Sequence, residues 1–359
     1  MQGLKIGRHW VPYPVVQGGM GVRVSGYRLA GHVALNGGVG IIASAGLGLG
    51  NPDFDGHNFF QADCDALKEE LRKAYEIAPD GVIGVNCMVA VNDYDDAVRA
   101  ACAGGAKLII SGAGLPMNLP DLTAGYPDVA LVPIVSSIKA AELIARKWNK
   151  AYGRLPDAVV VEDPDTAGGH LGEKPEKIGT GEYDQYATVR GVKSYFAETW
   201  NLDIPVIAAG GVWGRDDLEY ALAQGADAVQ MGTRFVVTEE CDADDAFKQA
   251  YLECTQEDIG LIMSPAGLPG RAIRKNIDGV RQHDVDLDVH CSVNCLKKCT
   301  YKAERERFCI VHALDRARLG DVATGLIFCG TNAWKADKIT TVKDVFAELF
   351  PQEQRAAVC

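Results

Sequence analysis

The chain has 359 residues, of which 47% are hydrophobic and 23% are charged, as is ordinary for a soluble globular protein. Its formal net charge of −12 argues against a nucleic-acid or anionic-membrane partner, because phosphate groups demand basic patches. The first residues lack a signal-peptide pattern, and no run of eighteen apolar residues follows. We therefore expect no membrane span and a cytoplasmic location, where eleven cysteines indicate free thiols or a metal site.

Short β-branched runs alternate with helical patterns along the first 235 residues. Strands are expected at Val15–Gln17, Gly40–Ser44, Val82–Asn86, Lys107–Ser111, Ala130–Val135, Ala158–Glu162, Pro205–Ala208 and Ala228–Met231. Helices are expected between them at Tyr27–Asn36, Asp63–Ile77, Tyr94–Ala103, Ile138–Asn149, Asp184–Thr199 and Asp216–Gln224. Eight strands with helices between them predict an α/β protein of the (β/α)8 TIM-barrel type, and a doubly wound open sheet is the alternative.

The barrel pattern stops shortly after Arg234, so we predict a barrel over residues 1–237. A smaller, mainly helical cap is expected over 238–330, with residues 241–262 helical and a cysteine-rich segment at 290–312. The last part, 331–359, has a helical pattern near 342–350. This part is expected to return to the barrel.

Two glycine-rich turns follow the seventh and eighth predicted strands, at Gly210-Gly211 and at Gly232-Thr233. Barrel enzymes place their active sites at the C-terminal strand ends, usually with a phosphate site at these two strands. Glycine lets backbone N–H groups approach phosphate oxygens, and Thr233 adds a hydroxyl donor. The turns therefore predict a phosphate cradle, and tight turns that need glycine only for their conformation are the alternative.

Polar groups close several other predicted strands. Gln17-Gly18-Gly19-Met20 follows the first strand, Asn86 ends the third, Ser111 the fourth and Glu162 the sixth. Gathered at one rim, these groups would offer donors and acceptors to a polar ring system such as isoalloxazine. Each can instead be a simple strand-end cap.

His170 is the best catalytic candidate. It follows the strand-end Glu162 and stands among Gly168, Gly169 and Gly172, which remove bulk around it. A lone histidine is more often structural, and that alternative stays open.

Cys291, Cys295 and Cys299 are spaced so that a helix would place all three thiols on one face, and Cys309 follows ten residues later. Four thiolates of this kind can hold an iron–sulfur cluster or zinc. The spacing matches no common cluster signature, and buried free thiols are the alternative.

Six motifs together resemble those of the nitronate monooxygenase (2-nitropropane dioxygenase) family, which includes the flavin-dependent enoyl-ACP reductases. The motifs are PVVQGGMGVRVSGYRLAGHVALNGGVGII, GVNCMVAV, LIISGAGLP, VVVEDPDTAGGHLG, PVIAAGGV and AVQMGTRF. The resemblance covers about residues 10–235 and, further on, SPAGLPGR and the GTNAW region. One departure is that Asp163-Pro164-Asp165-Thr166 follows Glu162, where the family usually has a glycine between its two acidic positions.

The resemblance implies an FMN-binding barrel with a small second domain. Gly210, Gly211, Gly232 and Thr233 would hold the phosphate, and His170 matches the family's active-site histidine. The cofactor-binding residues that would surround the ring and ribityl chain are Gln17, Gly18, Gly19, Met20, Asn86 and Glu162, with Ser111 and Gly169 beside them.

Three functions are considered, and the first is predicted because it carries the name of the broad family. The first is a nitronate monooxygenase that oxidises nitronates with O2 at the flavin, with His170 as hydrogen-bond donor or base. The second is a reductase of enoyl-ACP or another enoyl thioester, or a quinone reductase, with NAD(P)H as a transient electron donor. The third is a non-catalytic flavin-binding module. The expected substrate is a small molecule or an acyl thioester, and a homo-oligomer is left open.

Overall fold

The computed structural model describes residues 3–351 apart from 52–53, 55–56, 287–290, 292 and 302–307. Eight parallel strands close into a barrel in the order β10-β11-β3-β4-β5-β6-β7-β8. These strands are β3 (Val15–Gln17), β4 (Val39–Ala43), β5 (Val82–Met88), β6 (Leu108–Gly112), β7 (Ala130–Val135), β8 (Val159–Glu162), β10 (Val206–Ala209) and β11 (Ala228–Met231). The predicted TIM barrel is confirmed, and the open sheet is excluded because β11 pairs with β3.

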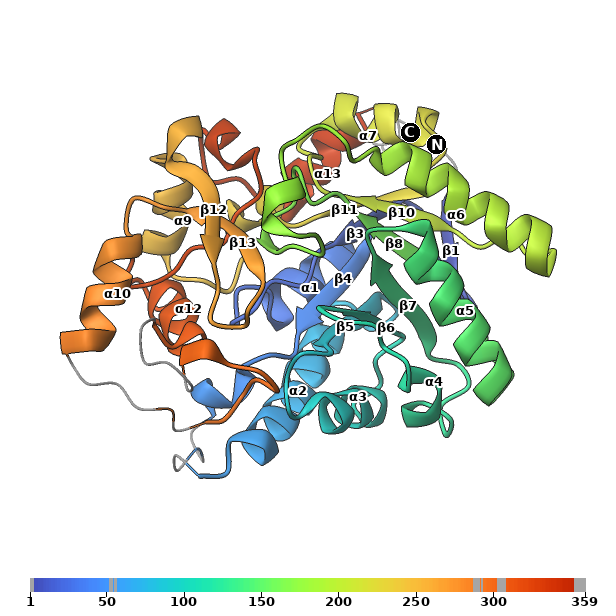
Figure 1. The fold of residues 1–359 in the computed structure, drawn as a ribbon, viewed down its shortest axis with the longest axis horizontal. Helices are drawn as coiled ribbons and strands as arrows, with labels where there is room; N and C mark the ends of the chain where they lie inside the picture. Colours follow the sequence, from blue (N-terminus) through green and yellow to red (C-terminus); the bar gives the residue numbers. More distant parts are fainter. Residues whose placement is uncertain are drawn as a thin grey trace.

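A helix follows each barrel strand, as Figure 1 shows. These helices are α1 (Tyr27–Leu35), α2 (Phe59–Ile77), α3 (Tyr94–Ala103), α4 (Leu119–Leu122), α5 (Ile138–Tyr152), α6 (Gln185–Trp200), α7 (Arg215–Ala223) and α8 (Thr233–Val236). The strands are buried on both faces, which accounts for their continuous apolar runs. Side-chain caps begin α5 and α6, where Ser137 and Asp184 accept hydrogen bonds from Ala140 N and Ala187 N.

An N-terminal hairpin that the sequence analysis did not predict packs against the barrel at the N-terminal ends of its strands. Strands β1 (Leu4–Ile6) and β2 (His9–Val11) pair antiparallel around Gly7, whose φ of +57° suits the tight turn. Leu4, Ile6 and Val11 are buried against inward-facing residues of the barrel strands. These strands are only three residues long, which is too short for a clear alternating pattern.

The cap is mainly helical, but it also contains a small sheet. The predicted helix over 241–262 is wrong in its second half, because α9 covers only Asp245–Leu252 and β12 (Ile259–Met263) follows. Strand β12 pairs with β13 (Pro269–Ile273), which pairs in turn with β9 (Gly169–His170). The run IGLIM becomes a strand because β13 offers it a pairing edge, and the sequence pattern cannot reveal that partner.

Three further helices complete the described chain. They are α10 (Ile277–Asp286), α12 (Ile310–Arg318) and α13 (Val342–Leu349). Figure 1 shows α9, α10, α12 and the β12–β13 hairpin gathered on one side of the barrel, with α13 beside α7. Phe346 and Phe350 stack around Tyr13, so the C-terminal segment contacts the barrel. Residues 352–359 of the predicted 331–359 segment lie outside the described residues.

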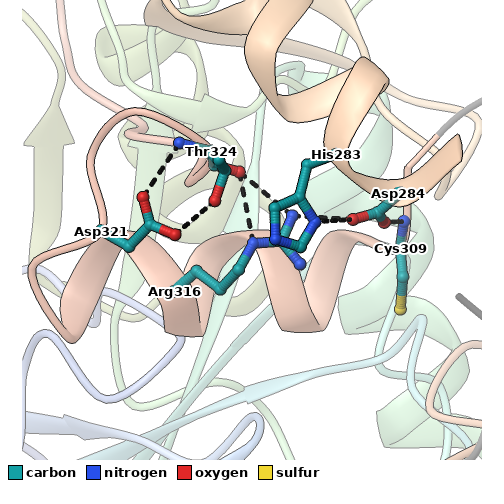
Figure 2. Close-up of polar contacts among 6 residues, drawn as sticks. All are labelled: His283, Asp284, Cys309, Arg316, Asp321 and Thr324. Carbon is teal, nitrogen blue, oxygen red and sulfur yellow. Dashed lines mark hydrogen bonds and ion pairs between the residues drawn. The ribbon is translucent and has the colours of Figure 1, made fainter. Parts of the chain in front are cut away.

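Figure 2 shows what joins α10 to α12. The buried Asp284 carboxylate accepts hydrogen bonds from Arg316 at 2.8 Å and from the N–H of Cys309 at 2.6 Å. Arg316 also donates to Thr324 O. One guanidinium thereby ties three pieces of the cap together.

Candidate functional site

A cavity of about 810 Å³ lies at the C-terminal ends of the barrel strands, between the barrel and the cap. Its volume is near the upper end of the range of roughly 300–1,000 Å³ that ligand pockets span. Eleven of the residues predicted from sequence line it. They are Gly18, Gly19, Met20, Asn86, Glu162, Gly169, His170, Gly210, Gly211, Gly232 and Thr233. The strand-end residues therefore do gather at one rim.

Gln17 and Ser111 do not line the cavity. The Gln17 side chain is fully buried, accepts a hydrogen bond from Ile41 N at 2.9 Å and donates to Gly18 O. The Ser111 hydroxyl donates to Cys87 O at 3.0 Å and contacts the Tyr94 hydroxyl at 2.9 Å. Both side chains tie neighbouring elements together below the rim.

The two predicted phosphate turns lie side by side and are braced by the C-terminal segment. Gly210 and Gly211 have φ values of +104° and +72°, a region that other residues rarely adopt. Asn332 Nδ2 donates to Gly211 O at 2.6 Å, and Gly330 N donates to Thr233 Oγ1 at 2.9 Å. Because the Thr233 hydroxyl accepts this bond, its own hydrogen remains available as a donor.

Gln230 is a cavity residue that the sequence analysis missed, although it stands inside the quoted motif AVQMGTRF. Its Oε1 atom is buried and has no hydrogen-bond partner among the residues that the structure describes. A buried acceptor of this kind costs free energy unless a ligand or water satisfies it. Gln230 therefore points to a bound molecule with a hydrogen-bond donor.

His170 stands on β9, where it pairs with Gly270 of β13. Its Nε2 lies 2.7 Å from the hydroxyl of Ser264, and its ring meets Phe328 edge-on at 5.2 Å. The ring reaches solvent only through the cavity, and this burial lowers its pKa to about 4. His170 is therefore neutral at physiological pH.

The Ser264 hydroxyl determines which ring nitrogen of His170 carries the proton. Ser264 is fully buried, and its Oγ already accepts a hydrogen bond from Ala266 N at 3.1 Å. Among the described residues the only other partner of this hydroxyl is His170 Nε2, so its hydrogen is used only if Ser264 donates to Nε2. The proton of the neutral ring therefore sits on Nδ1. Ser264 was missed because SPAGLPGR reads only as a glycine- and proline-rich turn.

Glu162 ends β8 inside the cavity, next to two further charged groups. Burial, and then the negative charge of Asp163, raise the pKa of its carboxyl to about 7 against the opposing positive charge of Arg271. A carboxyl of this kind exchanges a proton near neutral pH. The sequence predicted the position of Glu162 but not this property.

Asp63 and Asp93 form a carboxyl pair on another part of the cavity wall. Only 3% and 5% of the two residues are exposed, and their side chains hydrogen-bond each other. Asp63 also accepts bonds from the N–H groups of Gly46 and Gly48. Two carboxyl groups can hydrogen-bond only if one keeps a proton, and burial raises the pKa of both.

We expect this pair to make the protein less stable as pH rises. Above the ordinary aspartate pKa near 4 the unfolded chain has released a proton that the folded pair retains, so stability falls by up to about 1.4 kcal/mol per pH unit. In Asp93→Asn the amide donates permanently to Asp63, so urea unfolding at pH 5 and pH 8 should show a flatter dependence. Asp80→Asn, an exposed control, should keep the native slope. An unchanged slope in Asp93→Asn would refute the shared proton.

The predicted metal ligands lie in the cap. Cys309 is buried, Cys295 and Cys299 are half-buried and Cys291 is exposed. Within the described part of the chain, no group of three or more histidine, cysteine or acidic side chains is placed to hold a metal ion. Cys295 lines the cavity, and burial, followed by the nearby Cys309, raises the pKa of its thiol to about 12. The iron–sulfur or zinc site stays a prediction.

No helix in the described ranges is long and apolar enough to cross a membrane.

A family model described as nitronate monooxygenase matches residues 3–101 and 53–352. This chain belongs to the nitronate monooxygenase family. The predicted family is thereby confirmed, and the match extends through the whole of the predicted cap.

Known proteins agree with this family. The (3aS,4S,5R,7aS)-5-hydroxy-7a-methyl-1-oxo-octahydro-1H-indene-4-carboxyl-CoA dehydrogenase of Mycobacterium tuberculosis is 30% identical over 267 residues, covering 74% of this chain and 64% of that protein. A probable nitronate monooxygenase of Staphylococcus saprophyticus is 25% identical over 225 residues, covering 62% of this chain and 59% of that protein. FabK from Thermotoga maritima shares the fold, with a TM-score of 0.70 at 24% identity over 97% of this chain and 94% of its own. The family and the names of these relatives confirm the prediction of an oxidoreductase.

Proposed function

We propose that this member of the nitronate monooxygenase family is an FMN-dependent oxidoreductase. The cavity fits the cofactor for two reasons. Two glycine turns and the donating hydroxyl of Thr233 suit a phosphate, and the buried Gln230 Oε1, which has no partner among the described residues, suits a hydrogen-bond donor of the bound molecule. The turns at Gly210 and Gly232 would hold the phosphate. The residues that would surround the ring and ribityl chain are Gly18, Gly19, Met20, Asn86, Glu162, Gly169 and Gln230. Bound FMN would supply hydride and electron transfer.

We further propose that the substrate is a neutral acyl group carried as a thioester. The charged side chains that line the cavity in the described chain are Asp63, Asp93, Glu162, Glu173 and Lys174. Four of the five are acidic, Lys174 is exposed, and burial keeps His170 neutral. Apart from the exposed Lys174, the described lining offers no positive side chain to a small anion, and its surface accepts a neutral chain. The relative from M. tuberculosis is named as a dehydrogenase of a carboxyl-CoA compound, which supports this class.

His170 would act on the thioester carbonyl. When the β-carbon of an enoyl thioester gains a hydride, negative charge develops on the carbonyl oxygen until a proton reaches the α-carbon. The neutral ring, with its Nε2 held by Ser264, offers its Nδ1–H as a donor to that oxygen. Glu162 would exchange the proton, because its carboxyl titrates near neutral pH. In the dehydrogenase direction Glu162 would remove the proton from the α-carbon, and His170 would again donate to the carbonyl oxygen.

Nitronate oxidation with O2 is the second candidate, and the description of the family model favours it. A nitronate carries a negative charge over two oxygens and would accept the His170 hydrogen bond. Its weakness is that the only lysine or arginine among the described lining residues is the exposed Lys174, so a nitronate anion meets no buried countercharge. NAD(P)H and quinones are co-substrates of the related reductase alternative.

Anaerobic visible spectra of the purified protein would test these candidates. We expect flavin bands with the FMN that copurifies, and bleaching by a saturated medium-chain acyl-CoA or, for a reductase, by NADH or NADPH followed by reoxidation with the matching trans-2-enoyl-CoA. Bleaching by a nitronate alone would favour the second candidate. Absence of flavin both before and after incubation with FMN would overturn the proposed function.

A further inference from the structure

The arm that carries His170 is held by the cap. The arm comprises residues 163–171 and runs from the end of β8 through β9. Leu171 N donates to Pro269 O at 2.9 Å, and His170 and Gly169 pair with Gly270 and Arg271 of β13. A Cβ on Gly168 would lie only 2.4 Å from the backbone of Cys329, so the arm also packs closely against the segment before α13. The position of His170 therefore depends on the cap.

Arg271 grips the arm from β13 with its side chain. Its guanidinium donates through Nη1 to Ala167 O and through Nη2 to Pro164 O at 3.1 Å. These two carbonyls lie on either side of the Asp165–Thr166 turn. The side chain of Asp163 shapes that turn from inside, by accepting bonds from Asp165 N at 2.9 Å and from the Thr166 hydroxyl at 2.5 Å. The fork geometry of a guanidinium suits two carbonyls in this arrangement, and a single ammonium does not.

Arg271 also carries a buried positive charge. Only 5% of the residue is exposed, and it lies outside the cavity lining. Its charge is balanced by Asp163, and more weakly by Asp165 and Glu162. A buried arginine is costly unless its charge and its N–H groups are used. The N–H groups of Arg271 donate to carbonyls of the arm, and its positive charge lowers the pKa of Glu162, whose carboxyl lines the cavity.

We propose that Arg271 is a positioning residue that fixes the His170 arm against the cap. Its two hydrogen bonds hold the arm in the shape that presents the imidazole to the cavity. These two bonds depend on the turn formed by Asp163-Pro164-Asp165-Thr166. This is the sequence in which the chain departs from the family pattern. The effect on turnover rests on the proposed function, whereas the grip on the arm does not.

Arg271→Met and Arg271→Lys test the proposal, with Arg316→Met as the matched control. Arg316 is a half-buried cap arginine that also bonds to a carboxylate and a backbone carbonyl (Figure 2). It is not among the described cavity-lining residues, and none of its hydrogen bonds within the described chain is to the arm. Amide hydrogen exchange of residues 163–171, measured with and without added FMN, should rise about tenfold or more in Arg271→Met. Arg271→Lys should give a smaller rise. Arg316→Met should leave this peptide unchanged.

The pH dependence of turnover gives a second readout. Because the positive charge of Arg271 lowers the pKa of Glu162, the limb of the pH–rate profile that belongs to Glu162 should move to higher pH in Arg271→Met and stay near its native position in Arg271→Lys. We expect kcat to fall by about tenfold or more, with a smaller change in KM.

Unchanged exchange in Arg271→Met, or equal changes in Arg316→Met, would overturn the proposal. If Arg271→Met does not fold, Arg271→Lys tests the proposal. This variant should keep the Glu162 limb of the pH–rate profile and still raise the amide exchange of residues 163–171. A protein that binds no FMN and turns over no thioester would defeat the proposed function, while the exchange result would still decide the role of Arg271.

Discussion

Replacing His170 with alanine should lower kcat/KM by about 10²–10³-fold, which is the usual cost of removing one donor from a developing oxyanion. FMN should remain bound, because the phosphate turns lie on β10 and β11 and not on the arm. Stopped-flow measurement of the flavin half-reactions and the visible spectrum of the variant would check both parts. Burial lowers the pKa of His170 to about 4. The pH–rate profile of His170→Ala should therefore keep every titration that the native profile shows between pH 5 and 8.

His312→Ala is the matched control for this variant. His312 is also a histidine whose pKa is lowered by burial, but it stands on α12 outside the cavity lining. We expect its activity to remain within about threefold of the native value. Equal losses in the two variants would indicate that His170 acts only on stability. Full activity in His170→Ala would leave the ring without a catalytic role.

Adding side-chain bulk at Gly232 should weaken FMN binding without harming the fold. A Cβ there meets only Met20 Sδ at 3.5 Å and Met20 Cγ at 3.7 Å, and the backbone needs no positive φ. Gly232→Ala is therefore sterically acceptable to the protein, and the methyl group enters space that the cavity would give to the phosphate. We expect the Kd for FMN to rise about tenfold in Gly232→Ala and further in Gly232→Val, that is by at least about 1.4 kcal/mol.

Fluorescence titration of the flavin-free protein with FMN would measure this change, and thermal unfolding without FMN would establish that the fold is intact. Gly125→Val provides the control, because Gly125 is exposed and a Cβ there meets nothing within 4 Å. If Gly232→Val bound FMN as tightly as Gly125→Val, the phosphate would have to lie elsewhere in the cavity.

The sequence by itself determined the barrel and most of its rim. Runs such as VGIIA in β4 and VVVE in β8 predict buried parallel strands, and the two glycines after β10 mark a turn that only glycine fits readily. Because all strands of a parallel barrel end on the same side, the order of motifs was enough to gather Gly19, Asn86 and His170 at one cavity. These predictions depend on local pattern and on one topological rule.

Only the tertiary structure decided what those groups do. Ser264 fixes the tautomer of His170 from 94 residues away, Arg271 grips a turn more than 100 residues earlier, and Asp63 meets Asp93 across the ends of two helices. Strand β12 was predicted to be helical, and its pairing with β13, which itself pairs with the distant β9, makes it a strand. Burial and long-range contacts set the pKa values of His170 and Glu162, and neither is encoded in the spacing of neighbouring residues.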